Sequence, residues 1–134
     1  MTRAGRVLLA LLLPLVVGCA ETARLPRPED LPFHATDDPF FNLHWRLDRT
    51  PEEVRAVGLV EAARADGVGQ VIVELRELNA GGQIISSAAY HTYGKRLSQW
   101  DWWPFTVRLQ PKSQDDRFEV KVRSFSWAVG GCGH

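Results

Sequence analysis

Two patterns of hydrophobic and polar residues divide the chain. Residues 7–17 form an unbroken apolar run, VLLALLLPLVV, whereas from residue 41 onward apolar and polar residues mostly alternate. The apolar run is shorter than the roughly 20 residues that a membrane-spanning helix needs. Alternation is typical of strands that bury one face. The sequence therefore predicts a short N-terminal hydrophobic helix followed by a β-domain.

The alternating part of the chain predicts six or seven short strands joined by turns. Two of these strands flank the sequence NAGG, which is typical of a tight turn, and they predict a β-hairpin. Strands at this spacing favour an all-β fold, a small antiparallel sandwich of two sheets. The clearest expected strands cover residues 41–48, 71–78, 83–89, 103–109 and 118–122.

Two segments leave alternatives open. Residues 54–63 follow TPEE, a helix capping box, and carry valines every third position, which suits a helix. Gly58 in the middle of the segment, and apolar residues on both alternating faces, favour instead a strand covered on both sides. In the last strand the apolar side changes faces at Phe125 and Trp127, which indicates either a bulge near Ser124 or an end covered on both sides.

Length and charge limit the organisation of the chain. Its 134 residues suit one domain, and its 16 basic residues balance 16 acidic ones. Without Arg3 and Arg6 the balance is 14 to 16, so charge gives no reason to expect nucleic-acid binding. We expect four parts: a signal peptide (1–18), a proline-rich linker (19–39), the sandwich (40–128) and a glycine-rich tail (129–134).

The end of the apolar run carries a specific motif. Arg3 and Arg6 precede the run, and VVGC at residues 16–19 closes it with a small residue directly before a cysteine. This pattern resembles the lipobox of bacterial lipoproteins. The resemblance implies that the signal is cut before Cys19, whose thiol and new N-terminus then carry acyl chains. Several acyl chains on one residue make a lasting membrane anchor, whereas one chain holds only reversibly.

The residue after the cysteine bears on the destination of the protein. In the lipoprotein pattern an aspartate at this position favours retention in the inner membrane, and here the position is Ala20. The resemblance therefore implies a protein anchored in the outer membrane and facing the periplasm. The alternatives are an ordinary secretory signal with an incidental cysteine and an uncleaved N-terminal helix.

The order of strand motifs adds a second resemblance. VIVEL runs into LNAGG, a return strand follows, and WPFTVRL and FEVKVRSFSW complete the series between residues 41 and 127. This order resembles the small immunoglobulin-like sandwich domains of bacterial envelope proteins, including those named for an FxLYD motif. The resemblance implies a module without catalytic activity.

Candidate chemistry is sparse in this sequence. The nucleophile pattern GxSxG is absent, and no serine is accompanied by an obvious base. Cys132 and His134 offer two metal-type ligands, which His91 or His34 could join, but a glycine-flanked tail is a poor frame for a metal site. His44 falls on the polar face of its strand and is expected to be an exposed histidine. We expect no enzyme, no cofactor and no metal.

Tryptophans are the candidate functional residues. Trp100, Trp102 and Trp103 lie within four positions, and Trp127 ends the last expected strand. They could plug the gap between the sheets, or they could form an exposed patch that docks an envelope protein or a glycan. The sequence thus favours an anchored interaction or structural module. The alternative is a carrier or chaperone-like lipoprotein that holds an apolar ligand between its sheets, and it requires an internal cavity.

Overall fold

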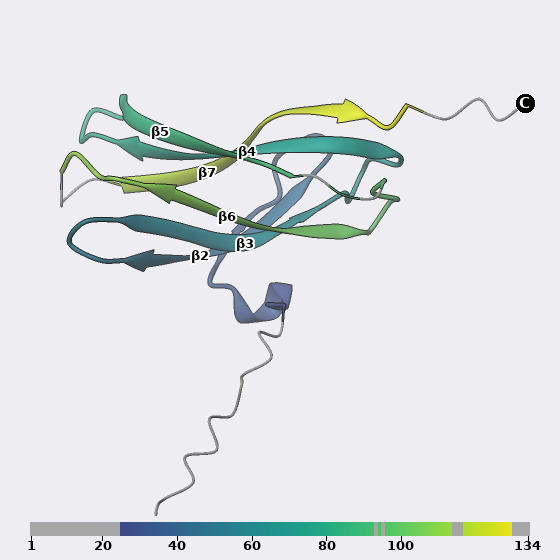
Figure 1. The fold of residues 1–134 in the computed structure, drawn as a ribbon, viewed down its shortest axis with the longest axis horizontal. Helices are drawn as coiled ribbons and strands as arrows, with labels where there is room; N and C mark the ends of the chain where they lie inside the picture. The colour runs from purple at the N-terminus through teal and green to yellow at the C-terminus, as the bar shows by residue number, and fades with distance from the viewer. Residues whose placement is uncertain (1–24, 93, 95, 114–116, 130–134) are drawn as a thin grey trace, which may run out of the picture.

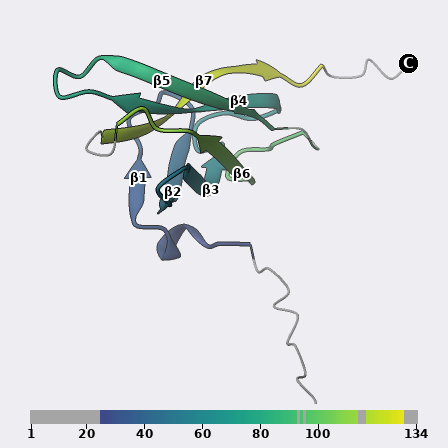
Figure 2. The same ribbon diagram turned by 60° about the vertical axis from the view of Figure 1, so that its left-hand side comes forward.

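The computed structural model describes residues 25–92, 94, 96–113 and 117–129. In these residues two antiparallel sheets pack face to face, so the predicted all-β sandwich is confirmed (Figures 1 and 2). The signal peptide, Cys19 and residues 130–134 lie outside the described residues. The elements are η1 (Pro28–Asp30), β1 (Phe33–Ala35), β2 (Asn42–Arg49), β3 (Val54–Glu61), β4 (Val68–Leu78), β5 (Ile84–His91), β6 (Trp102–Leu109) and β7 (Arg117–Trp127).

The strand order of the two sheets differs from that of an immunoglobulin constant domain. Sheet A has the order β1-β2-β3-β6 and sheet B the order β5-β4-β7. A constant domain joins its first, second, fifth and fourth strands in one sheet and its third, sixth and seventh in the other. The likeness to immunoglobulin-like domains is therefore one of two-layer architecture.

The structure decides both open alternatives: the first segment is a strand, and the last strand contains a bulge. Residues 54–61 form β3, and it pairs with β2 on one side and with β6 on the other. In the pairing of β4 with β7, Ile72 lies opposite Ser124 and Val73 lies opposite Val122, so Arg123 is the extra residue of a bulge. The bulge returns Phe125 to the core side of the sheet, where it packs against the buried cluster.

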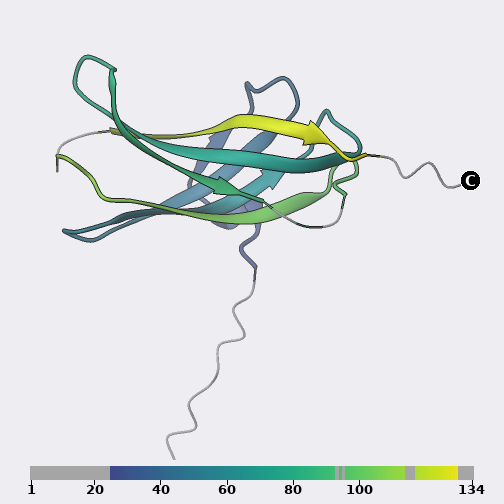
Figure 3. The ribbon, with the colours of Figure 1, turned by 45° about the horizontal axis from the view of Figure 1, so that its top comes forward.

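The domain begins earlier than the predicted boundary at residue 40. Phe33–Ala35 adds an edge strand to sheet A, and η1 precedes it. Leu31 is buried, and Leu59 is fully buried although the register of β3 directs it away from the other sheet. η1 lies on the side of sheet A that faces away from sheet B (Figures 1 and 2), and Figure 3 shows the two layers with the top of the molecule turned forward. The last third of the expected linker is therefore part of the folded domain.

The outer face of sheet B is polar and carries a network of ion pairs. Glu74 lies 2.6 Å from Arg76 and 3.6 Å from Arg123, and Glu119 lies 3.0 Å from Lys121 and 3.8 Å from Arg76. Charged residues of opposite sign on neighbouring strands keep such a face soluble, although exposed pairs add little stability. The outer face of sheet A also carries ion pairs, such as Asp48 with Arg46 and Arg55, but it buries Leu59 as well.

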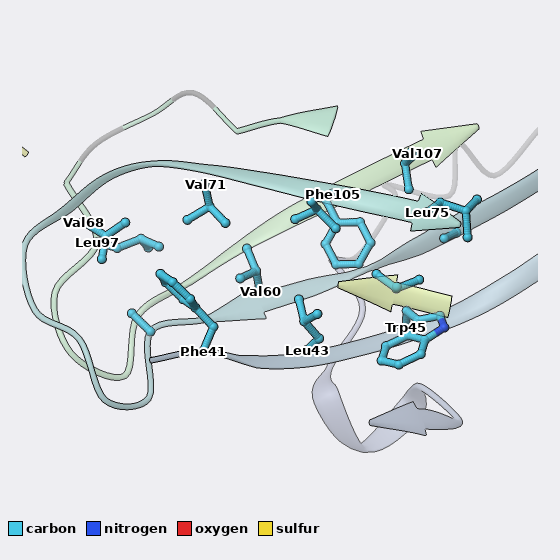
Figure 4. Close-up of a cluster of buried hydrophobic side chains, with 14 of the residues drawn as sticks. Phe41, Leu43, Trp45, Val60, Val68, Val71, Leu75, Leu97, Phe105 and Val107 are labelled. Carbon is cyan, nitrogen blue, oxygen red and sulfur yellow. The ribbon is translucent and has the colours of Figure 1, made fainter. Parts of the chain in front are cut away.

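Apolar side chains from both sheets fill the space between them. Figure 4 shows Leu43 and Trp45 from β2, Phe105 from β6, and Val71 and Leu75 from β4 directed into one cluster. Each of these residues lies on the side of its strand that alternation predicts. The core therefore follows from the pattern of the sequence.

A buried carboxylate closes the sandwich at the end where the β4–β5 turn lies. Glu77 is fully buried, and both of its carboxylate oxygens accept the backbone N–H of Lys112 at 2.9 Å. The hydroxyl of Ser86 donates a third hydrogen bond, 3.1 Å long. A buried charge is tolerated when it is hydrogen-bonded in this way. Glu77 thus ties the β4–β5 hairpin to the segment that follows β6.

Gly58 leaves room for the side chain of Phe105 and for the neighbouring strand β2. A Cβ atom at this position would lie 2.0 Å from the carbonyl oxygen of His44, 2.8 Å from Cβ of Trp45 and 2.9 Å from Cζ of Phe105. The ring of Phe105 therefore sits against the backbone of β3, directly opposite it in the register. Any side chain at Gly58 would push the ring and the neighbouring strand away.

We predict that Gly58→Ala destabilises the domain by at least about 2 kcal/mol, because the extra methyl overpacks the core. Chemical denaturation would measure the loss. Gly81→Ala is the matched control, since its Cβ would meet only Oδ1 of Asn79 at 3.4 Å, and a change within about 0.5 kcal/mol is expected. Equal stability of the two variants would contradict this account of the core.

Candidate functional site

Four segments meet at the end of the sandwich where β4 and β6 begin, which we call the loop end. The segment between β3 and β4, residues 62–67, lies at its centre and is bonded to the other three. The backbone N–H of Arg64 donates to Phe40, and that of Trp100 donates to Ala62. The carbonyl of Gly67 accepts the N–H of Ala128, directly after β7. The loop end thus carries the predicted tryptophans on segments that share one support.

The four tryptophans do not play one role. Trp103 is partly buried and packs against the core, and Gly94 would contact its indole if it carried a Cβ. Trp100, Trp102 and Trp127 are exposed, with 64%, 38% and 53% of their surface accessible. The plug interpretation therefore holds for Trp103, whereas the other three supply the exposed aromatic surface that a docking patch needs.

Trp100 has an unusual backbone conformation. Its φ is +72°, and it is the only described residue other than glycine with a positive value. A bulky residue in this region costs of order 1–3 kcal/mol, and such strain clusters at functional sites. The conformation is held by the hydrogen bond to Ala62 at 2.8 Å and by the neighbouring turn, in which Ser98 and Asp101 bond each other twice at 3.0 Å. The chain thus tolerates strain at its most exposed tryptophan.

Trp127 belongs to an aromatic cluster that the sequence pattern did not reveal. Its indole lies edge-on to Phe125 at 5.0 Å and to Phe40 at 6.0 Å between ring centroids, and Phe125 lies 5.0 Å from Phe41. Edge-to-face contacts at these distances stabilise aromatic pairs. Phe40 and Phe41 precede β2, so only the fold brings them to the end of β7. The cluster gives Trp127 a rigid apolar base.

Arg64 holds the β1–β2 loop in place beside this cluster. Its guanidinium donates to the backbone carbonyl of Asp38 at 2.6 Å and to that of Pro39 at 3.1 Å, and a further contact reaches Oδ1 of Asn42 at 3.1 Å. The fixed fork of an arginine suits several carbonyl acceptors at once. The carboxylate of Asp38 in turn accepts the N–H groups of the two phenylalanines that follow. The side chain of Arg64, which lies on the segment between β3 and β4, therefore orders the β1–β2 loop.

The interior of the sandwich is packed, and its hollows open to solvent. One groove of about 300 Å³ lies between β1, β2 and β7, with Leu43, Trp45, Val120 and Val122 in its floor and Asp37 on its rim. Hollows of about 240 and 350 Å³ lie beside Thr50 at the opposite end. Between the sheets, large side chains such as Phe105 occupy the centre.

Within the described residues no group of three or more His, Cys, Asp and Glu side chains is arranged to hold a metal ion. Cys132 and His134 lie outside the described residues. His44, expected to be an exposed strand histidine, instead lies half-buried and contacts His34 from β1, with 2.7 Å between their Nδ1 atoms. Nor does this part of the chain contain a helix long and apolar enough to cross a membrane.

The environment of His44 lowers its pKa below the usual 6.5. Burial is the main cause, since it removes water from the charged imidazolium, and the proximity of His34 acts in the same direction. The carboxylate of Glu61 opposes both effects and raises the pKa. The net direction favours the neutral imidazole of His44 in the folded protein.

Comparison with known proteins leaves the fold and the site as the basis for function. No family model, curated protein or solved structure that was compared with this chain matches it.

We predict that Trp100→Gly leaves the melting temperature unchanged or raises it by a few degrees, because glycine adopts a positive φ without strain. Trp103→Ser is the contrasting variant, since it removes a side chain packed against the core and should cost about 3 kcal/mol or more. Thermal denaturation followed by circular dichroism would measure both. A large loss of stability in the Trp100 variant would show that its indole serves the fold.

A second prediction concerns acid. Because the folded-state pKa of His44 is lowered, the unfolded chain binds a proton more readily, and stability decreases as the pH falls below about 6.5. Above that pH this residue adds no pH dependence. Denaturation curves between pH 8 and pH 5 should therefore show a smaller loss for His44→Asn than for the natural sequence. Parallel losses in both proteins would contradict the assignment.

Proposed function

We propose that this protein is a lipid-anchored interaction module of a bacterial cell envelope, without catalytic activity of its own. The main support for the interaction module is Trp100, which is 64% exposed and has a φ of +72°. Strain of this kind persists only where the surrounding structure enforces it, and exposed tryptophan is a common centre of binding energy. The proposed docking surface is the loop end, with Trp100, Trp102 and Trp127 as its aromatic residues.

The anchor part of the proposal rests on the lipobox-like end of the apolar run. Leu25, where the described structure begins, is the sixth residue after Cys19, and six residues of chain span at most about 20 Å. Acyl chains on Cys19 would therefore keep the sandwich close to the lipid surface. The partner surface is then presented from a fixed base in the periplasm, and Ala20 supports the outer membrane as that base.

The packed core supports an interaction module rather than a carrier. A carrier has to enclose its ligand, whereas the space between these sheets is occupied by Phe105, Trp45 and their neighbours. A docking module needs a rigid frame and an exposed apolar patch, and both are present at the loop end. The partner class that fits is a protein or glycan of the envelope with a face for stacking on indoles.

The test measures both the membrane attachment of the protein and its binding partner in the native host. We expect mass spectrometry to find an N-terminal Cys19 carrying acyl chains, and Cys19→Ala to move the protein out of the membrane fraction. A photo-crosslinking residue placed at Trp100 should then give a discrete adduct in the anchored protein. Recovery of the natural protein from the medium with an unmodified thiol at Cys19 would refute the proposed lipid anchor.

Matched controls separate the docking surface from the anchor. The same crosslinker at Arg108, an exposed position near the other end of β6, should give no adduct of that size. Replacing Trp102 and Trp127 by serine should remove the adduct at position 100 while acylation of Cys19 persists. An adduct that survives both serine replacements would place the docking surface elsewhere.

A further inference from the structure

Two histidine side chains face each other where the N-terminal segment joins sheet A. His34 of β1 lies directly opposite His44 of β2 in the register, and their Nδ1 atoms are 2.7 Å apart. The ring centroids are 5.0 Å apart, and the ring planes make an angle of 70°. The nitrogens of the two imidazoles therefore converge on one point from adjacent strands.

This contact can supply two nitrogen lone pairs when the hydrogen of the donor ring moves from Nδ1 to Nε2, which leaves both rings neutral. A hydrogen bond between two Nδ1 atoms needs one donor and one acceptor, so at most one hydrogen lies between them. A neutral imidazole is the form that binds metal ions, through the lone pair of one ring nitrogen. Glu61, which lies near enough to act on His44 electrostatically, adds a negative charge to the surroundings. The local chemistry thus suits a cation with affinity for nitrogen.

We propose that His34 and His44 form a two-imidazole site for a divalent transition-metal ion, and that Cu²⁺ fits it best. Bonds of about 2.0 Å to two nitrogens at a right angle set the nitrogens about 2.8 Å apart, whereas a tetrahedral angle sets them about 3.3 Å apart. The observed 2.7 Å matches adjacent positions of a square-planar or tetragonal ion. Cu²⁺ prefers that geometry and binds nitrogen ligands most strongly in the divalent series.

The remaining positions of the ion are filled by water or by an oxygen ligand. Within the described residues no third His, Cys, Asp or Glu side chain is arranged to complete a metal site, and Oε1 of Glu61 accepts a hydrogen bond from Nδ2 of Asn42 at 3.0 Å. The site is therefore a chelate of two protein ligands. Two ligands on adjacent strands bind an ion about 100-fold more tightly than one, because the second bond forms within the same molecule.

Metal binding at this place has a structural consequence. β1 is attached to sheet A through only three residue pairs, and the described chain before it runs to Leu25. An ion held by His34 and His44 would cross-link β1 to β2. It would thereby fasten the segment that leads from the domain toward Cys19, so occupancy of the site sets how firmly that segment is attached.

The test is a titration of the full chain with Ni²⁺, Zn²⁺ and Cu²⁺, each as the metal ion alone. We expect a saturable rise of a few degrees in melting temperature, greatest for Cu²⁺. In the Cys132→Ser background, which removes a competing thiol, the electron paramagnetic resonance spectrum of one bound Cu²⁺ should show coupling to two nitrogens. His34→Asn and His44→Asn should each lower the Cu²⁺ affinity about 100-fold and leave one coupled nitrogen.

The controls decide the outcome even if a variant is less stable. Each shift is compared with the melting temperature of the same variant without metal, and asparagine retains a hydrogen-bonding group at each position. His91→Asn removes a histidine from β5 and should keep the full response. The proposal is overturned if the double variant of His34 and His44 binds Cu²⁺ with unchanged affinity, or if the natural chain shows no saturable shift with any of the three ions.

Discussion

The fold depends on the close approach of Phe105 to the backbone of β3 at Gly58. Because Gly58 has no side chain, the aromatic ring can occupy the centre of the sandwich and contact β2 and β3 together. Val71 and Leu75 of β4 and Val120 of β7 belong to the same buried cluster from the other sheet. Close-packed interiors transmit strain, so this contact also fixes the spacing of the strands that carry the loop end.

The rigid core and the hydrogen-bonded loops hold the aromatic side chains of the loop end in place. Trp103 joins the core, and its fixed position places Trp102 on the opposite face of the same strand. Hydrogen bonds from the β3–β4 segment hold Trp100 in its left-handed conformation, and Arg64 orders the loop that brings Phe40 against Trp127. Three exposed indoles therefore stand on a framework with little freedom to rearrange, which reduces the entropic cost of binding a partner.

The N-terminal segment connects the sandwich to the proposed anchor. It covers the outer face of sheet A, where Leu31 and Leu59 are buried, and it enters the sheet through β1. The histidine pair lies at this entry, so the place where the chain could detach from the sheet is also the place where an ion could fasten it. The proposed anchor at Cys19, the proposed metal site and the proposed docking surface would then follow one another along the chain.

The sequence alone determined the all-β class, the hairpin around NAGG and the inward faces of most strands, because alternation and turn residues act over a few positions. It also raised both a bulge near Ser124 and a strand over residues 54–63, but could not exclude their alternatives, since the deciding contacts come from partner strands. The tertiary structure alone decided that Trp103 packs against the core while Trp100 is exposed, that Phe40 contacts Trp127, and that His34 faces His44. These residues are joined by strand order and register, which depend on packing between segments far apart in the chain, and no local pattern encodes that packing.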